Sequence, residues 1–155
     1  MPRSLLPALL LSLANLALAG GSVWAQRADV AIANRWGDFL STRIQGNRGF
    51  YSQRQWLIIT QEPDGLNCRD ERGQVIAVLA YGSVVDSDLA PGSDGEGIIL
   101  VAGRPWLRLS VDRLDLHLDL RPPAQRNRPL TCRVRAHSNF VAPLKPDTFS
   151  QAQPR

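Results

Sequence analysis

Two cysteines, Cys68 and Cys132, constrain the fold more than any other feature, because the chain has no others. The chain also begins with a segment that has the layout of an export signal. An even number of cysteines in an oxidising compartment indicates a disulfide. We therefore expect one bond that ties two segments far apart in sequence. A loop of about 65 residues closed in this way stabilises a domain by roughly 4 kcal/mol in the chain-entropy model. The pair indicates a structural role and not catalysis.

The first 25 residues resemble a secretory signal peptide. Arg3 supplies a positive charge, residues 5–19 form an apolar stretch, and two small-residue cleavage patterns follow. A retained membrane anchor is the alternative, but a spanning helix needs about 20 predominantly apolar residues and this stretch is shorter. We expect a periplasmic or extracellular protein that begins at Gln26, or as a second choice at Gly20. After removal of the signal we expect no membrane span.

The rest of the chain, residues 26–155, has the size of a single domain. Without Arg3 it carries 17 basic and 14 acidic side chains, a net charge of +3, and Lys145 is its only lysine. Nucleic-acid sites usually gather Lys and Arg on one face, whereas these arginines are scattered along a chain predicted to be exported. We therefore expect no nucleic acid among its partners.

Residues 26–54 form an N-terminal arm. Its apolar residues recur at three- and four-residue intervals: Val30, Ala33, Trp36, Leu40 and Ile44. This spacing favours one short amphipathic helix that ends near Gly46. Gly37 weakens the helical pattern, so an irregular arm is the alternative. For Trp36 and Phe39 we consider two roles, covering one end of the domain or contacting a partner protein.

From Trp56 onward, short apolar runs alternate with turn signals, a pattern typical of an all-β domain. Strands are expected over residues 56–60, 66–69, 75–80, 84–85, 98–102, 105–111, 114–120, 130–135 and 140–141. Four acids lie within residues 86–97, but Ala90 and Pro91 occupy positions where an EF-hand loop needs an oxygen ligand and glycine. We interpret this segment as a solvated hairpin loop.

The inward and outward positions change parity at Asp112-Arg113, which predicts a bulge or turn there. After it the leucines at 114, 116, 118 and 120 share one face, and Asp115, His117 and Asp119 share the other. Three such side chains can bind a metal, but no further His or Cys lies nearby. Alternating charge on an exposed strand face is the simpler interpretation. Residues 121–129 contain consecutive prolines and are expected to form a loop.

Several short motifs follow one another in order between residues 55 and 143. They are Gly65-Leu-Asn-Cys-Arg69, Val75-Ile76 with Leu79, Tyr81-Gly-Ser-Val-Val85, Trp106-Leu-Arg-Leu109, Cys132-Arg-Val-Arg-Ala136 and Asn139-Phe-Val-Ala-Pro143. Their order resembles the bacterial SH3-like (SH3b) domains of exported proteins, and most of all the cysteine-containing form common in cyanobacteria. The resemblance implies a small barrel of five to six strands over 55–143, with a disordered tail over 144–155.

Four residues match the SH3b pattern individually. Leu66 matches the buried leucine after the first turn, and Trp106 matches the tryptophan that opens a later strand. Cys132 and Val134 match inward positions of the strand that closes the barrel, which supports the Cys68–Cys132 bond. Two features depart from the pattern. The position of Arg133 is usually aromatic, and residues 112–128 are longer than the usual tight turn, which suggests an added hairpin.

The sequence gives no support to an enzyme. It contains no nucleophile elbow, no His-Glu-x-x-His and no phosphate-binding glycine loop, so we expect neither catalysis nor a cofactor. The SH3b resemblance implies instead a non-catalytic module that recognises peptidoglycan or an envelope peptide. Trp106 and Tyr81 are the candidate groove residues, with Arg104 and Arg108 as partners for carboxylates. The alternative role for Trp106 is packing at the barrel edge.

A second hypothesis is an envelope protein that acts as an interaction partner or scaffold. In this case the N-terminal arm and the 112–128 hairpin would contact another protein. Pulling the protein down with purified peptidoglycan, with and without Trp106→Ala, separates the two hypotheses.

Overall fold

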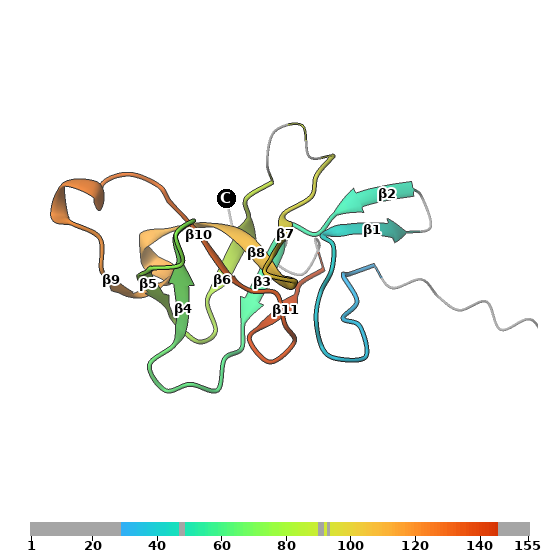
Figure 1. Ribbon diagram of the computed structural model, residues 1–155, viewed down its shortest axis with the longest axis horizontal. Helices are drawn as coiled ribbons and strands as arrows, with labels where there is room; N and C mark the ends of the chain where they lie inside the picture. The colour runs from blue at the N-terminus through green and yellow to red at the C-terminus, as the bar shows by residue number, and fades with distance from the viewer. Residues whose placement is uncertain (1–28, 47–48, 90–91, 93, 146–155) are drawn as a thin grey trace, which may run out of the picture.

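The computed structural model describes residues 29–46, 49–89, 92 and 94–145 (Figure 1). The predicted signal peptide and residues 146–155 of the predicted tail lie outside this part. Its strands are β1 (Arg43–Gly46), β2 (Gly49–Ser52), β3 (Gln55–Ile58), β4 (Leu66–Arg69), β5 (Val75–Leu79), β6 (Val84–Ser87), β7 (Ile98–Val101), β8 (Arg104–Val111), β9 (Leu116–Asp119), β10 (Leu130–Arg135) and β11 (Val141–Pro143). The described helices are two 3₁₀ turns, η1 (Arg113–Asp115) and η2 (Pro123–Gln125). The prediction of an all-β fold is confirmed.

The strands pair antiparallel in two groups. Strands β1 and β2 form a separate hairpin, and the other strands form one sheet in the order β11-β3-β6-β8-β10-β4-β5-β9. Strand β8 is its centre. It pairs with β10 along one edge and with β7 and β6 along the other, β7 beside its first half and β6 beside its second half. Figure 1 shows β8 and β10 running through the middle of the molecule.

The core lies on the inward face of this sheet, which curves around it. Inward positions on eight of its strands supply the core side chains, among them Trp56, Ile58, Leu79, Leu107, Leu109, Val134 and Val141, all fully buried. Phe39 of the arm packs edge-on against Trp56 with ring centroids 5.1 Å apart, and so closes one end of the core. The indole N–H of Trp56 donates to Ser87 Oγ at 2.9 Å, which satisfies its one buried donor.

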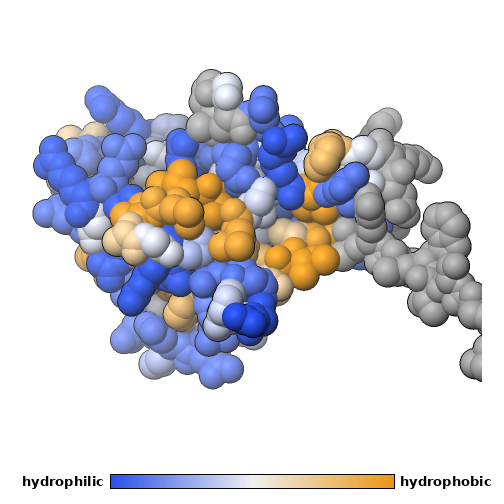
Figure 2. Space-filling model, turned by 45° about the vertical axis from the view of Figure 1, so that its right-hand side comes forward, coloured by the Kyte–Doolittle hydropathy of each residue, from blue (hydrophilic) through white to orange (hydrophobic). Residues whose placement is uncertain are grey.

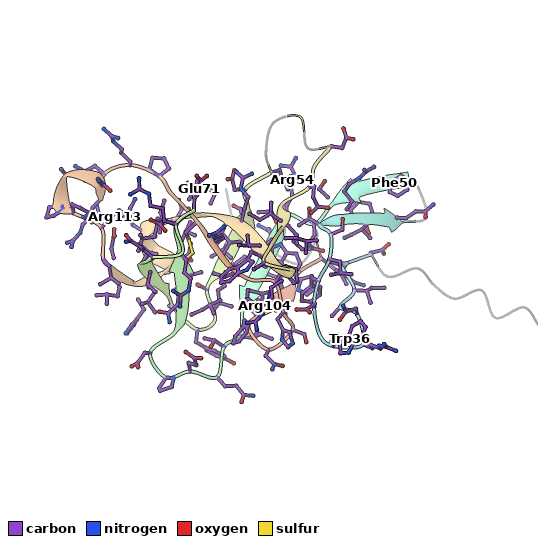
Figure 3. All side chains as sticks on the ribbon, viewed as in Figure 1. Trp36, Phe50, Arg54, Glu71, Arg104 and Arg113 are labelled. Carbon is purple, nitrogen blue, oxygen red and sulfur yellow. A yellow bond between two sulfur atoms is a disulfide. The ribbon has the colours of Figure 1, made fainter. Side chains whose placement is uncertain are left out.

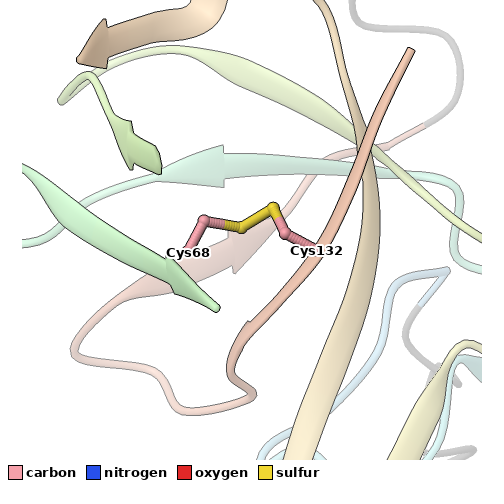
Figure 4. Close-up of a disulfide and its surroundings, with 2 residues drawn as sticks. All are labelled: Cys68 and Cys132. Carbon is pink, nitrogen blue, oxygen red and sulfur yellow. A yellow bond between two sulfur atoms is a disulfide. The ribbon is translucent and has the colours of Figure 1, made fainter. Parts of the chain in front are cut away.

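A disulfide joins Cys68 on β4 to Cys132 on β10, as the sequence predicts, with the two Cα atoms 5.6 Å apart (Figure 4). Both cysteines are buried and point into the core. The ladder between β4 and β10 is very short, because Arg69 opposite Arg133 is its one register pair. The disulfide therefore adds a covalent connection where the hydrogen-bonded ladder is short.

The arm has the irregular form and not the helical one. Residues 29–42 are mostly irregular with a turn at residues 35 and 36, where the Asn34 side chain accepts hydrogen bonds from the backbone N–H groups of Trp36 at 2.9 Å and Asp38 at 3.0 Å. Gly37 has φ +87°, a conformation outside the right-handed helix. Apolar spacing predicts a helix only where nothing local competes for the backbone, and here an Asx turn does so. Of the two predicted aromatics, Phe39 is buried and Trp36 is exposed.

Two polar side chains, half-buried Glu96 and buried Gln53, hold the arm in place. Glu96 accepts hydrogen bonds from the N–H and Oγ1 of Thr42, both at 2.9 Å, and from the N–H of Ile98 at 2.8 Å. Burial alone would raise the pKa of Glu96, but the hydrogen bonds from Ser41, Thr42 and Ile98 lower it overall. Gln53 accepts from the N–H of Ala31 and donates to the carbonyl of Leu144. The arm is thus fixed to both the β6–β7 connection and the last strand.

The 112–128 segment is not the separate hairpin that the sequence predicted. The η1 turn confirms a break near residue 113, but β9 then joins the main sheet as an edge strand beside β5. A register shift at Val78/Leu79 places Leu116 opposite buried Leu79, whereas Leu118 lies opposite Val78. Leu118 is 48 % exposed, so the prediction that the leucines share one face is wrong. One extra residue in the strand reversed its faces.

An ion pair explains the reversed face of β9. Asp119 lies opposite buried Ala77, and the guanidinium of Arg121 binds it through Nε–Oδ1 at 3.0 Å and Nη2–Oδ2 at 2.8 Å. The same guanidinium donates to the carbonyl of Arg128 at 3.1 Å and so closes the following loop. Hydrogen bonding from Arg121 lowers the pKa of Asp119 to about 2. A paired carboxylate of this kind can be buried, whereas an isolated one cannot.

Candidate ligand-binding surface

The face of β8 that points away from the core carries a tryptophan between arginines. Along this strand Pro105, Leu107, Leu109 and Val111 are buried, so the alternate residues Arg104, Trp106, Arg108 and Ser110 lie on the outer face. Trp106 is half-buried, and Arg104 is exposed at the β7–β8 turn. Three of the four predicted binding residues therefore share one surface.

The register of β10 adds two more arginines to this surface. Arg135 lies opposite Trp106, and Arg133 lies opposite Arg108. Their guanidinium carbons are 5.8 Å and 5.6 Å from the centre of the Trp106 ring, within the range of cation–π attraction. On the other side of Trp106, Ile99 of β7 is its cross-strand partner and is 37 % exposed. The ring thus has cations on one side and an apolar neighbour on the other.

The row of arginines continues onto β4. Arg69 is the cross-strand partner of Arg133, so Arg69, Arg133 and Arg108 lie side by side on three neighbouring strands. Arg69, Arg133 and Arg135 were not predicted from the sequence as site residues. The alternation of residues 130–135 already places Arg133 and Arg135 on an outward face, but the strand order that brings them beside Trp106 is not visible in the sequence.

These arginines differ in how their charge is balanced. Arg108 Nη2 is 2.6 Å from Asp88 Oδ2, and Arg135 Nη2 is 2.9 Å from Asp38 Oδ1. The third ion pair of the described residues is Asp119–Arg121, so no carboxylate is paired there with Arg69 or Arg133.

Arg69 and Arg133 instead donate to backbone carbonyls in the β4–β5 turn. Arg69 Nη1 donates to Gly73 at 2.9 Å and Arg133 Nη2 donates to Glu71 at 2.7 Å. These bonds fix the direction of each guanidinium but leave its full charge in place.

Tyr81, the fourth predicted residue, lies away from this surface. It is 72 % exposed in the β5–β6 turn, next to Ala80, whose N–H donates to the carbonyl of Asp115. It therefore lies beyond the C-terminal end of β8, roughly 15 Å along the strand from Trp106 at about 3.3 Å per residue. Figure 3 labels Arg104 and Arg113, which mark the two ends of β8. Tyr81 and Trp106 do not line one groove.

A second surface, at the arm, is apolar. Residues in 30–34 and 40–45 line a shallow hollow of about 370 Å³. Large apolar side chains are exposed around it or nearby: Ile32, Trp36, Leu40 and Phe50. Figure 2 shows hydrophobic side chains gathered at this end of the molecule, and Figure 3 labels Trp36 and Phe50 there. Trp36 is covered on one face by the guanidinium of Arg35, 4.0 Å from the ring centre.

The described residues contain neither a metal-type cluster of side chains nor a membrane-spanning helix. No three His, Cys, Asp or Glu side chains gather there as a metal site requires. Asp119 Oδ2 accepts a hydrogen bond from Arg121 at 2.8 Å, and Asp115, His117 and Asp119 form no metal-type cluster in the described part of the chain. None of the helices in that part of the chain is long and apolar enough to cross a membrane.

The fold and this surface define a class of protein: a small all-β domain that is cross-linked by one disulfide and carries a tryptophan among arginines on the outer face of its central strand. Comparison with family models, curated proteins and solved structures found no match to the chain. The function is therefore argued from the surface itself.

Proposed function

We propose that this chain is an exported, non-catalytic binding module of the SH3b type that recognises peptidoglycan or an acidic envelope peptide on the outer face of β8 and β10. One observation carries the proposal: the half-exposed ring of Trp106 lies among arginines on β8 and β10, two central strands that pair along the whole of β10. Binding residues on paired strands are held more precisely than residues on loops.

The chemistry of the surface fits such a polymer. The Trp106 ring offers a flat apolar face to a sugar or an aliphatic side chain, and Ile99 extends that face. Arg104, at the rim, is exposed, and a guanidinium binds a carboxylate through two parallel hydrogen bonds. Peptidoglycan combines sugar rings with acidic peptides, so both parts of the surface would be used.

Sedimentation with purified peptidoglycan tests this proposal. The oxidised protein is expected to sediment with the polymer at low salt, and Trp106→Ala is expected to weaken binding about tenfold, the equivalent of about 1.4 kcal/mol. Tyr81→Ala is the matched control, because Tyr81 is an exposed aromatic away from this surface. No sedimentation of the wild type would exclude wall binding. Equal effects of the two substitutions would remove Trp106 from the site.

The alternative function is a scaffold that binds an envelope protein through the arm. Exposed Ile32 and Leu40, which both line the hollow, favour it, because exposed apolar side chains that gather on a surface mark interaction sites. The 112–128 segment also exposes Leu118, but β9 lies at the opposite edge of the sheet from β11, beside which Gln53 fixes the arm. Cross-linking in envelope fractions that is lost in Leu40→Ser and kept in Trp106→Ala would favour this alternative.

A further inference from the structure

We propose that the cross-strand row Arg69–Arg133–Arg108 is a subsite for the carboxylates of an acidic peptide, and that the disulfide holds this subsite together. The inference rests on the proposed function and names the ligand chemistry of one part of that surface. It is carried by the strand register, the balance of charge and the position of the disulfide.

The register places three like charges side by side. Arg133 is the direct partner of Arg69 on β4 and of Arg108 on β8. Neighbouring strands are roughly 4.8 Å apart, and like charges directly opposite one another destabilise a sheet. Such a row is unfavourable in the free protein unless other groups offset it. An anion that bridges the arginines removes the repulsion and adds attraction.

Intramolecular partners offset only part of this charge. Asp88 pairs with Arg108, but the bonds of Arg69 and Arg133 go to backbone carbonyls and not to carboxylates. Arg133 Nε is also buried without a hydrogen-bond partner among the described residues. Arg133 in the middle of the row and Arg69 at one end therefore keep their positive charge. Their guanidinium groups are also oriented before a ligand binds, which lowers the entropic cost of ordering them on binding.

The disulfide lies directly beneath the uncompensated pair. Cys68 precedes Arg69 and Cys132 precedes Arg133, so on each strand the cysteine points into the core and the arginine points outward. Arg69 opposite Arg133 is also the one register pair between β4 and β10. The covalent bond thus holds two strands together at the point where their arginines repel each other.

The spacing of the row selects the ligand. Each guanidinium presents a planar fork that matches a carboxylate, and the charges repeat at roughly one strand separation. A peptide with neighbouring acidic side chains supplies carboxylates at comparable separations. Trp106, beside the row and 5.6 Å from the guanidinium of Arg133, would contact the apolar part of the same ligand.

Binding of an acetylated, amidated tri-glutamate peptide to the full exported protein tests the subsite, with tri-glutamine as the neutral control. We expect isothermal titration to show binding of tri-glutamate only, weaker at 200 mM than at 20 mM NaCl. Arg69→Gln and Arg133→Gln should each lower the affinity about tenfold. Arg72→Gln is the matched control, because Arg72 is an exposed arginine in the adjoining turn and the net charge changes equally. Circular dichroism checks that each variant is folded.

A reduction experiment tests the role of the disulfide. Reduction with dithiothreitol should lower the tri-glutamate affinity of the wild type several-fold under conditions where circular dichroism shows a folded protein. The Arg133→Gln protein should show no such loss. Equal affinity of oxidised and reduced wild type would remove the disulfide from the proposal.

The outcomes separate this inference from the proposed function. No binding of tri-glutamate, or equal effects of Arg133→Gln and Arg72→Gln, would overturn the subsite. Tighter binding of tripolyphosphate than of tri-glutamate at equal ionic strength would also overturn it, since the ligand chemistry would then be phosphate. Peptidoglycan binding that is lost in Trp106→Ala but kept in Arg133→Gln would overturn the subsite alone. Tri-glutamate binding without peptidoglycan binding would overturn the wall-binding function and support the subsite.

Discussion

Removing the disulfide by Cys68→Ala and Cys132→Ala together should destabilise the protein by about 4 kcal/mol. The two cysteines are 64 residues apart, and the chain-entropy relation for a loop of that length gives about 14 cal/mol/K, or about 4 kcal/mol at 25 °C. Loss of two buried sulfur atoms adds to this value, since Cys68 and Cys132 are 0 % and 7 % exposed. The total stability of a domain is about 5–15 kcal/mol, so the variant should unfold near room temperature or at low denaturant concentration.

Unfolding of the double variant should begin at one part of the sheet. Strands β5 and β9 are connected to the centre only through β4, because the sheet order there is β10-β4-β5-β9. With one register pair between β4 and β10, and two arginines at that pair, these three strands should open first. Amide exchange in the double variant is expected to accelerate in β4, β5 and β9 well before β3 and β11.

Guanidinium chloride unfolding of four samples checks this prediction: the wild type and the double variant, each with and without dithiothreitol. Reduced wild type and the double variant should have similar midpoints, and dithiothreitol should not change the variant. A difference of less than about 1 kcal/mol between oxidised wild type and the variant would contradict the entropic argument. Uniform exchange across all strands would contradict the separation of β4, β5 and β9.

Two further predictions concern stability. The pKa of Asp119 is lowered from 3.8 to about 2, so the ion pair with Arg121 makes its full contribution to the free energy of unfolding above about pH 4. This contribution, about 1–2 kcal/mol after solvent screening, is lost as the pH falls towards 2. Urea midpoints of wild type and Asp119→Asn should therefore converge between pH 4 and 2, and parallel curves would contradict the assignment. Gly65→Ala should cost about 2 kcal/mol or more, because Gly65 has φ +92° and its new Cβ would clash with the carbonyl of Leu79. Gly73→Ala, with φ +85° and open space, should cost only about 1 kcal/mol in the same thermal melts, and equal costs would exclude the clash.

Most of the strands and the disulfide could be predicted from the sequence, because their signals are local. Apolar runs bounded by turn residues place β3 to β8 and β10 near the observed bounds, and Cys68 and Cys132 have no other partner to choose. The arm was harder to predict. Its apolar spacing favours a helix, but the Asn34 side chain and the positive φ of Gly37 build a turn instead, and Phe39 is buried against Trp56.

The two faces of β9 show a second limit of prediction from the sequence. A single register shift placed Leu118 outward and Asp119 inward, and the inward carboxylate is stable because Arg121 folds back onto it two residues later. Alternation in a sequence indicates that a strand has two faces. It does not indicate which face is buried when a charged residue carries its own counter-ion.

The binding surface depended on strand order, which the sequence does not contain. Arg69, Arg108 and Arg133 are far apart along the chain, and this scatter was one ground for expecting no nucleic acid among the partners. In the folded chain β4, β10 and β8 are neighbours, and the register aligns the three side chains in one row. The scattered arginines therefore gather on one face, and the premise of that prediction does not hold.

The same register gives the cysteine pair a second consequence beyond fold stability. A disulfide between adjacent strands fixes the residues next to it, and here those residues are Arg69 and Arg133, which repel each other. Without the bond, the simplest relief of that repulsion is separation of β4 from β10, which would disperse the row. With it, the charge stays concentrated, and binding an anion is the remaining way to lower the electrostatic energy. Stability and recognition would then depend on one covalent bond, so the oxidation state of the cysteines should change both in the same direction.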